Sequence, residues 1–139
     1  MKYAVLNNGL VIKDTRGHTI YRRELAPSKA LRIATFLNSK KADYFFVADG
    51  HHEKMDFIFL KDSLDRSEYL QKVYDRTRGV NFVFRTLSDL QSFRKVPLIQ
   101  IAAVEDYLKL RKMQQSIQAS LPSPYRAIVV KNIGIIYFA

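Results

Sequence analysis

The chain of 139 residues contains no cysteine, which excludes a disulfide framework and thiolate chemistry. It has no run of about 18 apolar residues, the minimum for a membrane-spanning helix. The apolar stretch at residues 3–6 is too short to be a signal peptide. These three absences favour a soluble protein of the reducing cytoplasm.

Several sequence motifs that indicate an active site are also absent. The sequence has no Gly-x-Ser-x-Gly, no phosphate loop of the Walker type and no dinucleotide-binding fingerprint. It therefore gives no support to nucleophilic catalysis by serine, to nucleotide hydrolysis of the P-loop kind or to a Rossmann cofactor site. By itself the chain shows no catalytic, cofactor-binding or metal-binding residue.

Composition predicts one globular domain over residues 1–139, because 47% of the residues are hydrophobic and 12% are aromatic. The formal net charge of +10 is the one unusual value. A basic chain suits nucleic acid, an anionic membrane or phosphorylated small molecules. Lysine and arginine are scattered, however, and no block of five or six basic residues forms a nucleic-acid arm.

Alternation, helical spacing and turn residues predict an α+β fold. Gly17 supplies the positive φ of a hairpin turn, Pro27 starts a helix, Ser67 caps a second helix and Gly79 closes it. The expected strands are 3–6, 10–13, 19–23, 44–47, 57–60, 80–84, 97–103, 126–130 and 134–138, with helices after Pro27, after Ser67 and over 104–121, and a loop or single helical turn over 87–95.

The terminal hairpins require antiparallel pairing, so we expect a mixed, largely antiparallel sheet with helices on one face. Strands 44–47 and 57–60 are apolar on both faces. Such strands are normally covered on both sides. Either a partner surface or an edge of the helix layer covers them.

The order of these elements carries a family resemblance. Strand 3–6 runs into Asn7-Asn8-Gly9, a hairpin turns at residues 14–17, and Leu25-Ala26-Pro27 opens a helix. A late strand at 96–101 leads into the long helix, and strand 134–138 leaves the module. Over essentially its whole length the chain resembles the type IIB cap domain of a Cof-like phosphatase of the haloacid dehalogenase superfamily.

The chain departs from that family in lacking its catalytic parts. The resemblance implies a nucleophile motif Asp-x-Asp-Gly-Thr, a phosphate-binding lysine and a Mg²⁺-binding Gly-Asp-x-x-Asp segment, and none occurs here. We therefore expect a substrate-specificity cap, excised from a parent phosphatase whose missing core domain binds Mg²⁺. The implied substrates are small phosphorylated metabolites such as sugar phosphates, and the isolated chain is expected to be catalytically inactive.

The resemblance also implies residues that face the substrate or form the hinge. Asn8 and Gly9 would lie at the hinge edge, although they also suit a plain tight turn. The remaining candidates are His51, His52, Arg94 and Lys95. The histidines, within Asp49-Gly50-His51-His52-Glu53, suit a substrate-facing loop, a solvated loop or, less well, a metal site. The basic pair could grip a phosphate or carboxylate, or form a charged rim before a strand.

The sequence also allows a second class of function, that of a binding module. A stand-alone basic α+β module could bind an anionic partner such as RNA if aromatic side chains pointed outward beside arginine. Phe82 and Phe84 with Arg85 are the candidates for such a surface. Acidic residues at 62, 65 and 68 lack a histidine or metal motif, so we interpret that segment as helix capping rather than catalysis.

Overall fold

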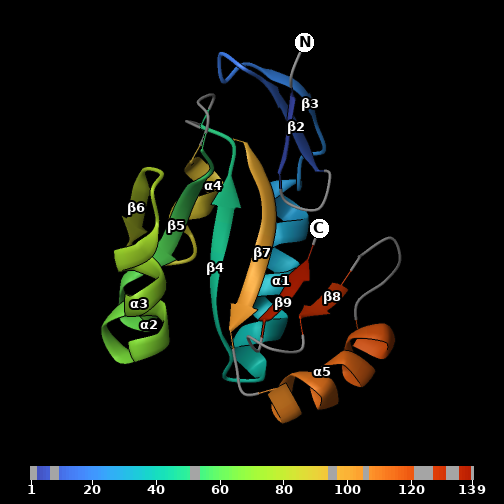
Figure 1. Cartoon of the computed structure of the whole chain (residues 1–139). Coiled ribbons are helices and arrows are strands. Elements are labelled where there is room, and N and C mark those ends of the chain that lie inside the picture. The colour runs from blue at the N-terminus through green and yellow to red at the C-terminus, as the bar shows by residue number, and fades with distance from the viewer. Residues whose placement is uncertain are drawn as a thin grey trace.

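The computed structural model describes residues 3–6, 10–50, 54–93, 97–104, 107–120, 127–130 and 135–138, which form two sheets and five helices. The smaller sheet stands at one end of the larger one (Figure 1). The strands are β1 (Tyr3–Leu6), β2 (Val11–Asp14), β3 (Thr19–Arg22), β4 (Asp43–Ala48), β5 (Asp56–Leu60), β6 (Asn81–Phe84), β7 (Leu98–Val104), β8 (Ala127–Val130) and β9 (Ile135–Phe138). The helices are α1 (Pro27–Ser39), α2 (Lys61–Arg66), α3 (Glu68–Arg76), α4 (Asp89–Ser92) and α5 (Tyr107–Ser120).

The small sheet is antiparallel, in the order β1-β2-β3. Its second turn follows from local chemistry, since Gly17 has a φ of 81° and the Asp14 carboxylate accepts hydrogen bonds from the backbone N–H groups of Arg16 and His18 at 2.9 Å. A register shift between Ile12 and Lys13 marks a β-bulge in the β2–β3 pair.

The large sheet has the strand order β6-β5-β4-β7-β9-β8. All its neighbouring strands are antiparallel except β5 and β6, which are parallel. Parallel neighbours need a crossover, and α2 and α3 provide it. The predicted α+β class and the mixed, largely antiparallel sheet are confirmed.

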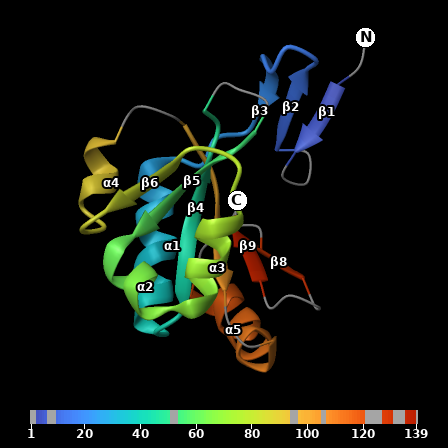
Figure 2. The same ribbon diagram turned by 60° about the vertical axis from the view of Figure 1, so that its left-hand side comes forward.

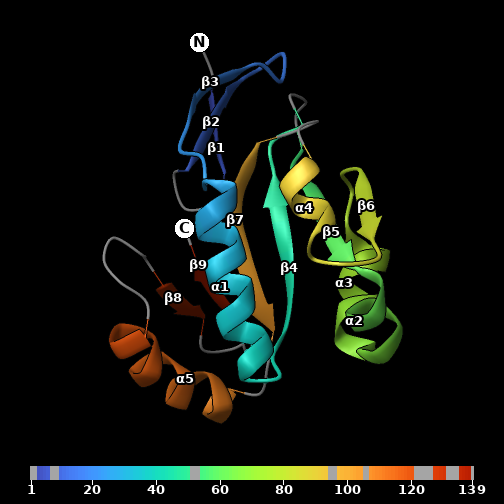
Figure 3. The same ribbon diagram turned by 180° about the vertical axis from the view of Figure 1, so that it is seen from behind.

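Helices cover both faces of the large sheet, a fuller arrangement than the single helical face that the sequence predicted. Buried residues of α1 and α4 form one cluster with Tyr44 and Phe46 of β4. On the opposite face, Leu70 of α3 packs in a second cluster with Phe45 and Phe59. Figures 2 and 3 show α3 and α1 on opposite sides of β4. The strands that are apolar on both faces are thus covered within the chain itself.

Three details of the helices differ from the predictions. The segment directly after β5 forms α2, which the sequence analysis did not expect. Helix α3 begins as predicted, with the Ser67 hydroxyl accepting from the backbone N–H of Leu70 at 3.2 Å, but it ends at Arg76 with Thr77 as C-cap, so Gly79 does not close it. Gly79 instead lies against the backbone of Met55. The strand before α5 also extends to Val104, and the helix begins at Tyr107.

The small sheet meets the large sheet where β4 ends and β7 begins. Leu10 and Val11 are buried in the same cluster as Val47 and Ile99 of the large sheet. The backbone N–H of Leu25, between β3 and α1, donates to the carbonyl of Leu98 at 2.7 Å. None of the helices among the described residues combines the length and the apolar composition of a membrane span.

Candidate functional site at the junction of the two sheets

None of the six residues predicted to face substrate or to form the hinge can be placed. They lie outside the described residues and are Asn8, Gly9, His51, His52, Arg94 and Lys95. Their roles stay predictions. What the structure does describe are the residues that adjoin these segments, and several of them meet at the junction of the two sheets.

The end of β4 and the start of β7 are tied together at this junction. The backbone N–H of Asp49 donates to the carbonyl of Pro97 at 3.0 Å. Asp49 and Gly50 directly precede the segment with the two histidines, and Pro97 directly follows the segment with the basic pair. Both segments are therefore attached to the same end of the large sheet.

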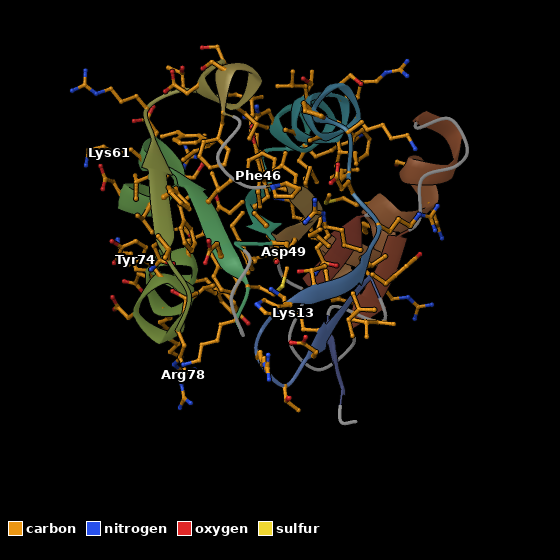
Figure 4. All side chains as sticks on the ribbon, turned by 90° about the horizontal axis from the view of Figure 1, so that it is seen from above. Lys13, Phe46, Asp49, Lys61, Tyr74 and Arg78 are labelled. Carbon is orange, nitrogen blue, oxygen red and sulfur yellow. The ribbon has the colours of Figure 1, made fainter. Side chains whose placement is uncertain are left out.

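Asp49 is the centre of the junction. Its carboxylate is fully buried and accepts from three side chains of the small sheet. Lys13 of β2 donates its Nζ to Oδ1, while Thr19 of β3 donates its hydroxyl to Oδ2 at 2.6 Å and Arg22 donates Nη1 to Oδ2 at 3.4 Å. Figure 4 shows Lys13 and Asp49 pointing toward one another at the centre of the molecule.

The electrostatics of this cluster are those of a compensated buried charge. Lys13 is 1% exposed and Asp49 is 0% exposed, so neither charge is stabilised by bulk water. Their mutual attraction and the hydroxyl of Thr19 offset the loss of hydration. Arg22 is partly exposed and also donates Nε to Glu24 at 2.9 Å, so the positive charges at the junction are matched by carboxylates.

Within the segment 49–53, this arrangement bears on Asp49 alone, because residues 51–53 lie outside the described residues. The Asp49 carboxylate is held by an ammonium, a hydroxyl and a guanidinium, which compete directly with a metal ion. Among the residues that the structure describes, no three histidine, aspartate or glutamate side chains gather closely enough to hold a metal ion. Asp49 is therefore a structural residue of the junction.

Sequence reasoning missed Lys13, which it treated only as a strand residue. The signal was the alternation of β2, where Val11 and Lys13 are buried while Ile12 and Asp14 are partly exposed. A lysine at an inward position of a strand requires a buried carboxylate opposite it. The partner, 36 residues away, could not be named from the pattern alone.

The remaining candidates are accounted for by packing and local ion pairs. The rings of Phe82 and Phe84 meet the ring of Phe93 edge to face, with centroids 5.2 and 5.1 Å apart, and pack against the core cluster under α1. They do not form an outward stacking surface for bases. Asp65 pairs with Lys61 one helical turn away, at 3.2 Å, on the exposed side of α2.

Comparison with known proteins gives similarity of structure without similarity of sequence. No family model and no curated protein matches the sequence. Solved structures match over nearly the whole chain. A Cof-like hydrolase of the haloacid dehalogenase (HAD) type from Plasmodium vivax has a TM-score of 0.68 and 15% identity, with 95% of this chain and 43% of that chain covered.

Two further structures belong to the same group. A haloacid dehalogenase-like hydrolase from Bacteroides thetaiotaomicron has a TM-score of 0.70 and 12% identity, covering 95% of this chain and 46% of that one. A sugar phosphatase of HAD subclass IIB has a TM-score of 0.64 and 12% identity, covering 100% and 46%. The chain spans about half the length of the solved structures that it matches. The chain has the fold of the matching part of Cof-like hydrolases of the haloacid dehalogenase superfamily, as the sequence resemblance implied.

Proposed function

We propose that the chain is the substrate-specificity cap of a Cof-like hydrolase, a Mg²⁺-dependent phosphatase that acts on small phosphorylated metabolites such as sugar phosphates. The observation that carries the proposal is the match over 94–100% of this chain to 43–53% of each solved hydrolase. The missing partner is the catalytic core domain of the parent protein.

The roles proposed for this cap follow from the segments that the chain contains. A cap closes over the reaction centre, excludes water and contacts the part of the substrate that is not transferred. The segments at 51–53 and 94–96 are attached to the same end of the large sheet, through Gly50 and Pro97. In this proposal His51, His52, Arg94 and Lys95 contact the substrate there, and Asn8 and Gly9 belong to the hinge.

We assign Mg²⁺ to the core domain, because the described residues of this chain do not fit it. Mg²⁺ takes oxygen ligands in an octahedral arrangement, usually from one or two carboxylates, the substrate phosphate and water. Asp49, the buried carboxylate nearest the proposed substrate-facing segments, is held by Lys13 and Thr19. When bound in the core, Mg²⁺ supplies charge neutralisation of the transferring phosphoryl group.

A binding module for RNA receives no support from a specific feature. The aromatic candidates Phe82 and Phe84 pack on Phe93, and strands β4 and β5 are covered on both faces within the chain. The basic composition suits an anionic small molecule equally well.

The test begins with the coding sequence on both sides of this segment. An in-frame Asp-x-Asp-Gly-Thr motif upstream and a Gly-Asp-x-x-Asp motif downstream are expected. The full-length product is then assayed with Mg²⁺ against a panel of phosphorylated metabolites, beside the 139-residue chain and a full-length variant whose nucleophile aspartate is replaced by asparagine. We expect turnover only from the unmodified full-length protein. Enzyme-like turnover by the 139-residue chain, or flanking sequence without either motif, would contradict the proposal.

A further inference from the structure

The positive charge of the chain is concentrated in two of its segments. Residues 25–42 and 107–139 together contain nine lysine and arginine residues and no acidic residue, whereas the rest of the chain contains fourteen basic and thirteen acidic residues. These two segments therefore carry +9 of the formal net charge of +10. They include the helices α1 and α5. A net charge confined in this way indicates a surface for an anionic partner.

Helices α1 and α5 pack on the same face of the large sheet, although they are far apart in the sequence. Met113 of α5 is buried in the cluster that contains Ile33 and Leu37 of α1. Figures 1 and 3 both show the start of α5 beside the end of α1. Helix α3 covers the opposite face. The fold thus brings the two helices of the basic segments to one side of the molecule.

The outer sides of both helices expose basic side chains. The buried residues of α1 face the sheet, and Arg32 is exposed on the other side of the helix. Lys40 and Lys41 directly follow α1 and are exposed as well. In α5, Arg111 and Lys112 are exposed next to the buried methionine. These side chains, with Leu108, form what we call the α1–α5 surface.

The acidic residues near this surface are too few to neutralise it. Five of them belong to α4 or adjoin the two basic segments in sequence: Glu24, Asp43, Asp89, Glu105 and Asp106. The carboxylates of Glu24 and Asp43 already pair with Arg22 at 2.9 Å and with Arg66 at 3.6 Å. Five acidic residues stand against the nine basic residues of the two segments, so this side of the molecule stays positive.

An exposed leucine distinguishes between the possible anionic partners. Leu108 of α5 is 68% exposed, and Arg111 and Lys112 follow it by three and four residues, so the three side chains lie on one face of the helix. The phosphate backbone of a nucleic acid offers no apolar contact to a leucine, and neither helix exposes a described aromatic side chain on which bases could stack. A membrane surface suits both features, because anionic head groups attract the basic residues and the acyl boundary accepts the leucine.

We propose that the α1–α5 surface binds an anionic membrane, with its basic side chains at the lipid head groups and Leu108 at the acyl boundary. Binding of this kind is peripheral and reversible, since it depends on charges that salt screens. A second copy of this chain does not suit the surface, because two chains of net charge +10 repel each other. The inference does not rest on the phosphatase proposal, because it uses only the charge and exposure of these two helices.

Co-sedimentation of the 139-residue chain with lipid vesicles tests the proposal. One set of vesicles contains phosphatidylcholine alone, and the other contains phosphatidylcholine with about 30% phosphatidylserine, which makes its surface negative. We expect the chain to sediment with the anionic vesicles only, and to be released by about 0.5 M sodium chloride because salt screens the attraction. A chain that stays in solution with both sets of vesicles at low salt would overturn the proposal.

Two matched double variants locate the binding surface. Arg32→Glu with Lys112→Glu reverses one exposed charge on each helix of the α1–α5 surface, and should weaken binding to anionic vesicles by more than about tenfold. Lys72→Glu with Arg76→Glu changes the net charge equally, but on exposed positions of α3 across the sheet, and should weaken it by less than about threefold. Equal weakening by the two pairs would overturn the proposal, because binding would then follow net charge alone.

Circular dichroism establishes that each variant is folded. If the reversed pair on α1 and α5 unfolds, Arg32→Gln with Lys112→Gln takes its place, with Lys72→Gln and Arg76→Gln as its control.

Leu108→Ser separates a membrane from a nucleic acid as the partner. The substitution removes an apolar side chain and leaves every charge in place, so it should weaken binding to anionic vesicles by about threefold or more. Binding to a DNA duplex of mixed sequence, measured by fluorescence anisotropy, should not change. Vesicle binding that is unaffected by Leu108→Ser, together with tighter binding to the duplex than to the vesicles, would overturn the membrane as the partner and assign the surface to a nucleic acid.

Discussion

Gly79 lies so close to Met55 that a Cβ atom at position 79 would sit 1.8 Å from the Met55 carbonyl oxygen. This contact joins the segment before β6 to the segment before β5. Two hydrogen bonds hold the same segments together. The backbone N–H of Phe57 donates to the carbonyl of Val80 at 3.0 Å, and Asp56 accepts from the N–H of Val80 at 2.9 Å. Only glycine permits this approach, and the approach sets the parallel register of β5 and β6.

Replacing Gly79 with alanine should therefore destabilise the protein by at least about 2 kcal/mol, because backbone atoms of Met55 would have to move. Urea unfolding followed by circular dichroism measures the change. Arg78→Ala is the matched control, since Arg78 is exposed and the same substitution next door should change stability by less than about 0.5 kcal/mol. Equal stabilities of the two variants would show that the approach of residue 79 to Met55 is not tight.

A second prediction concerns the stability that the buried Lys13–Asp49 ion pair contributes. Asp49→Ala should cost about 3–5 kcal/mol, because it removes the carboxylate that accepts from the buried ammonium of Lys13. The double variant Lys13→Met with Asp49→Leu removes both charges and should recover much of that loss. Denaturant unfolding of the single and double variants measures both effects.

The exposed pair Lys61–Asp65 provides the contrast for that experiment. Both side chains are exposed, at one helical turn, so Asp65→Ala should cost no more than about 0.5 kcal/mol. A similar loss in Asp49→Ala and Asp65→Ala would mean that the junction is open to water and that its ion pair is not a buried one.

Features that depend on neighbours in sequence were predictable. The turn at Gly17, the start of α1 at Pro27 and the cap of α3 at Ser67 each rest on contacts within a few residues, and the structure confirms them. Such signals are local because one side chain satisfies, or one ring removes, a backbone group nearby.

Features that depend on distant contacts were not predictable. Gly79 looked like a helix terminator, but the reason for glycine is the backbone of Met55, which lies 24 residues earlier along the chain. Lys13 looked like an ordinary strand residue, but its partner is 36 residues away. The coverage of both sheet faces likewise required knowledge of where α3 packs. A single sequence contains no local signal for these pairings.

Tyr44 gives a prediction about alkaline pH. Burial raises the pKa of Tyr44 to about 12, because the phenolate would lose its hydration. The pKa in the folded protein thus exceeds the ordinary tyrosine pKa of 10.0. The stabilisation by neutral Tyr44 is complete below about pH 10 and is lost as the pH rises toward 12.

The measurement is urea unfolding at a series of pH values from 8 to 12, on the unmodified protein and on Tyr44→Phe. By linkage the unmodified protein should lose roughly 2–3 kcal/mol relative to Tyr44→Phe across the alkaline range. At neutral pH Tyr44→Phe should be less stable by about 1 kcal/mol, because the bond to Asn38 is gone. Parallel stability curves for the two proteins above pH 10 would contradict a raised pKa.

The last prediction concerns Gln100. Its replacement is expected to stabilise the protein, whereas most substitutions in a protein core destabilise it. Its Oε1 is buried on β7 without a donor among the described residues, so the amide contributes desolvation cost without a compensating bond. Methionine has a similar length and no such acceptor, so Gln100→Met should stabilise the protein by about 1 kcal/mol.

The variant for comparison is Asn81→Leu. That amide accepts from Thr77 at 2.7 Å and donates to the carbonyl of Tyr74 at 3.2 Å, so its loss should destabilise. Chemical unfolding of both variants decides the point: destabilisation by Gln100→Met as large as that by Asn81→Leu would show that the Gln100 amide is hydrogen-bonded in solution.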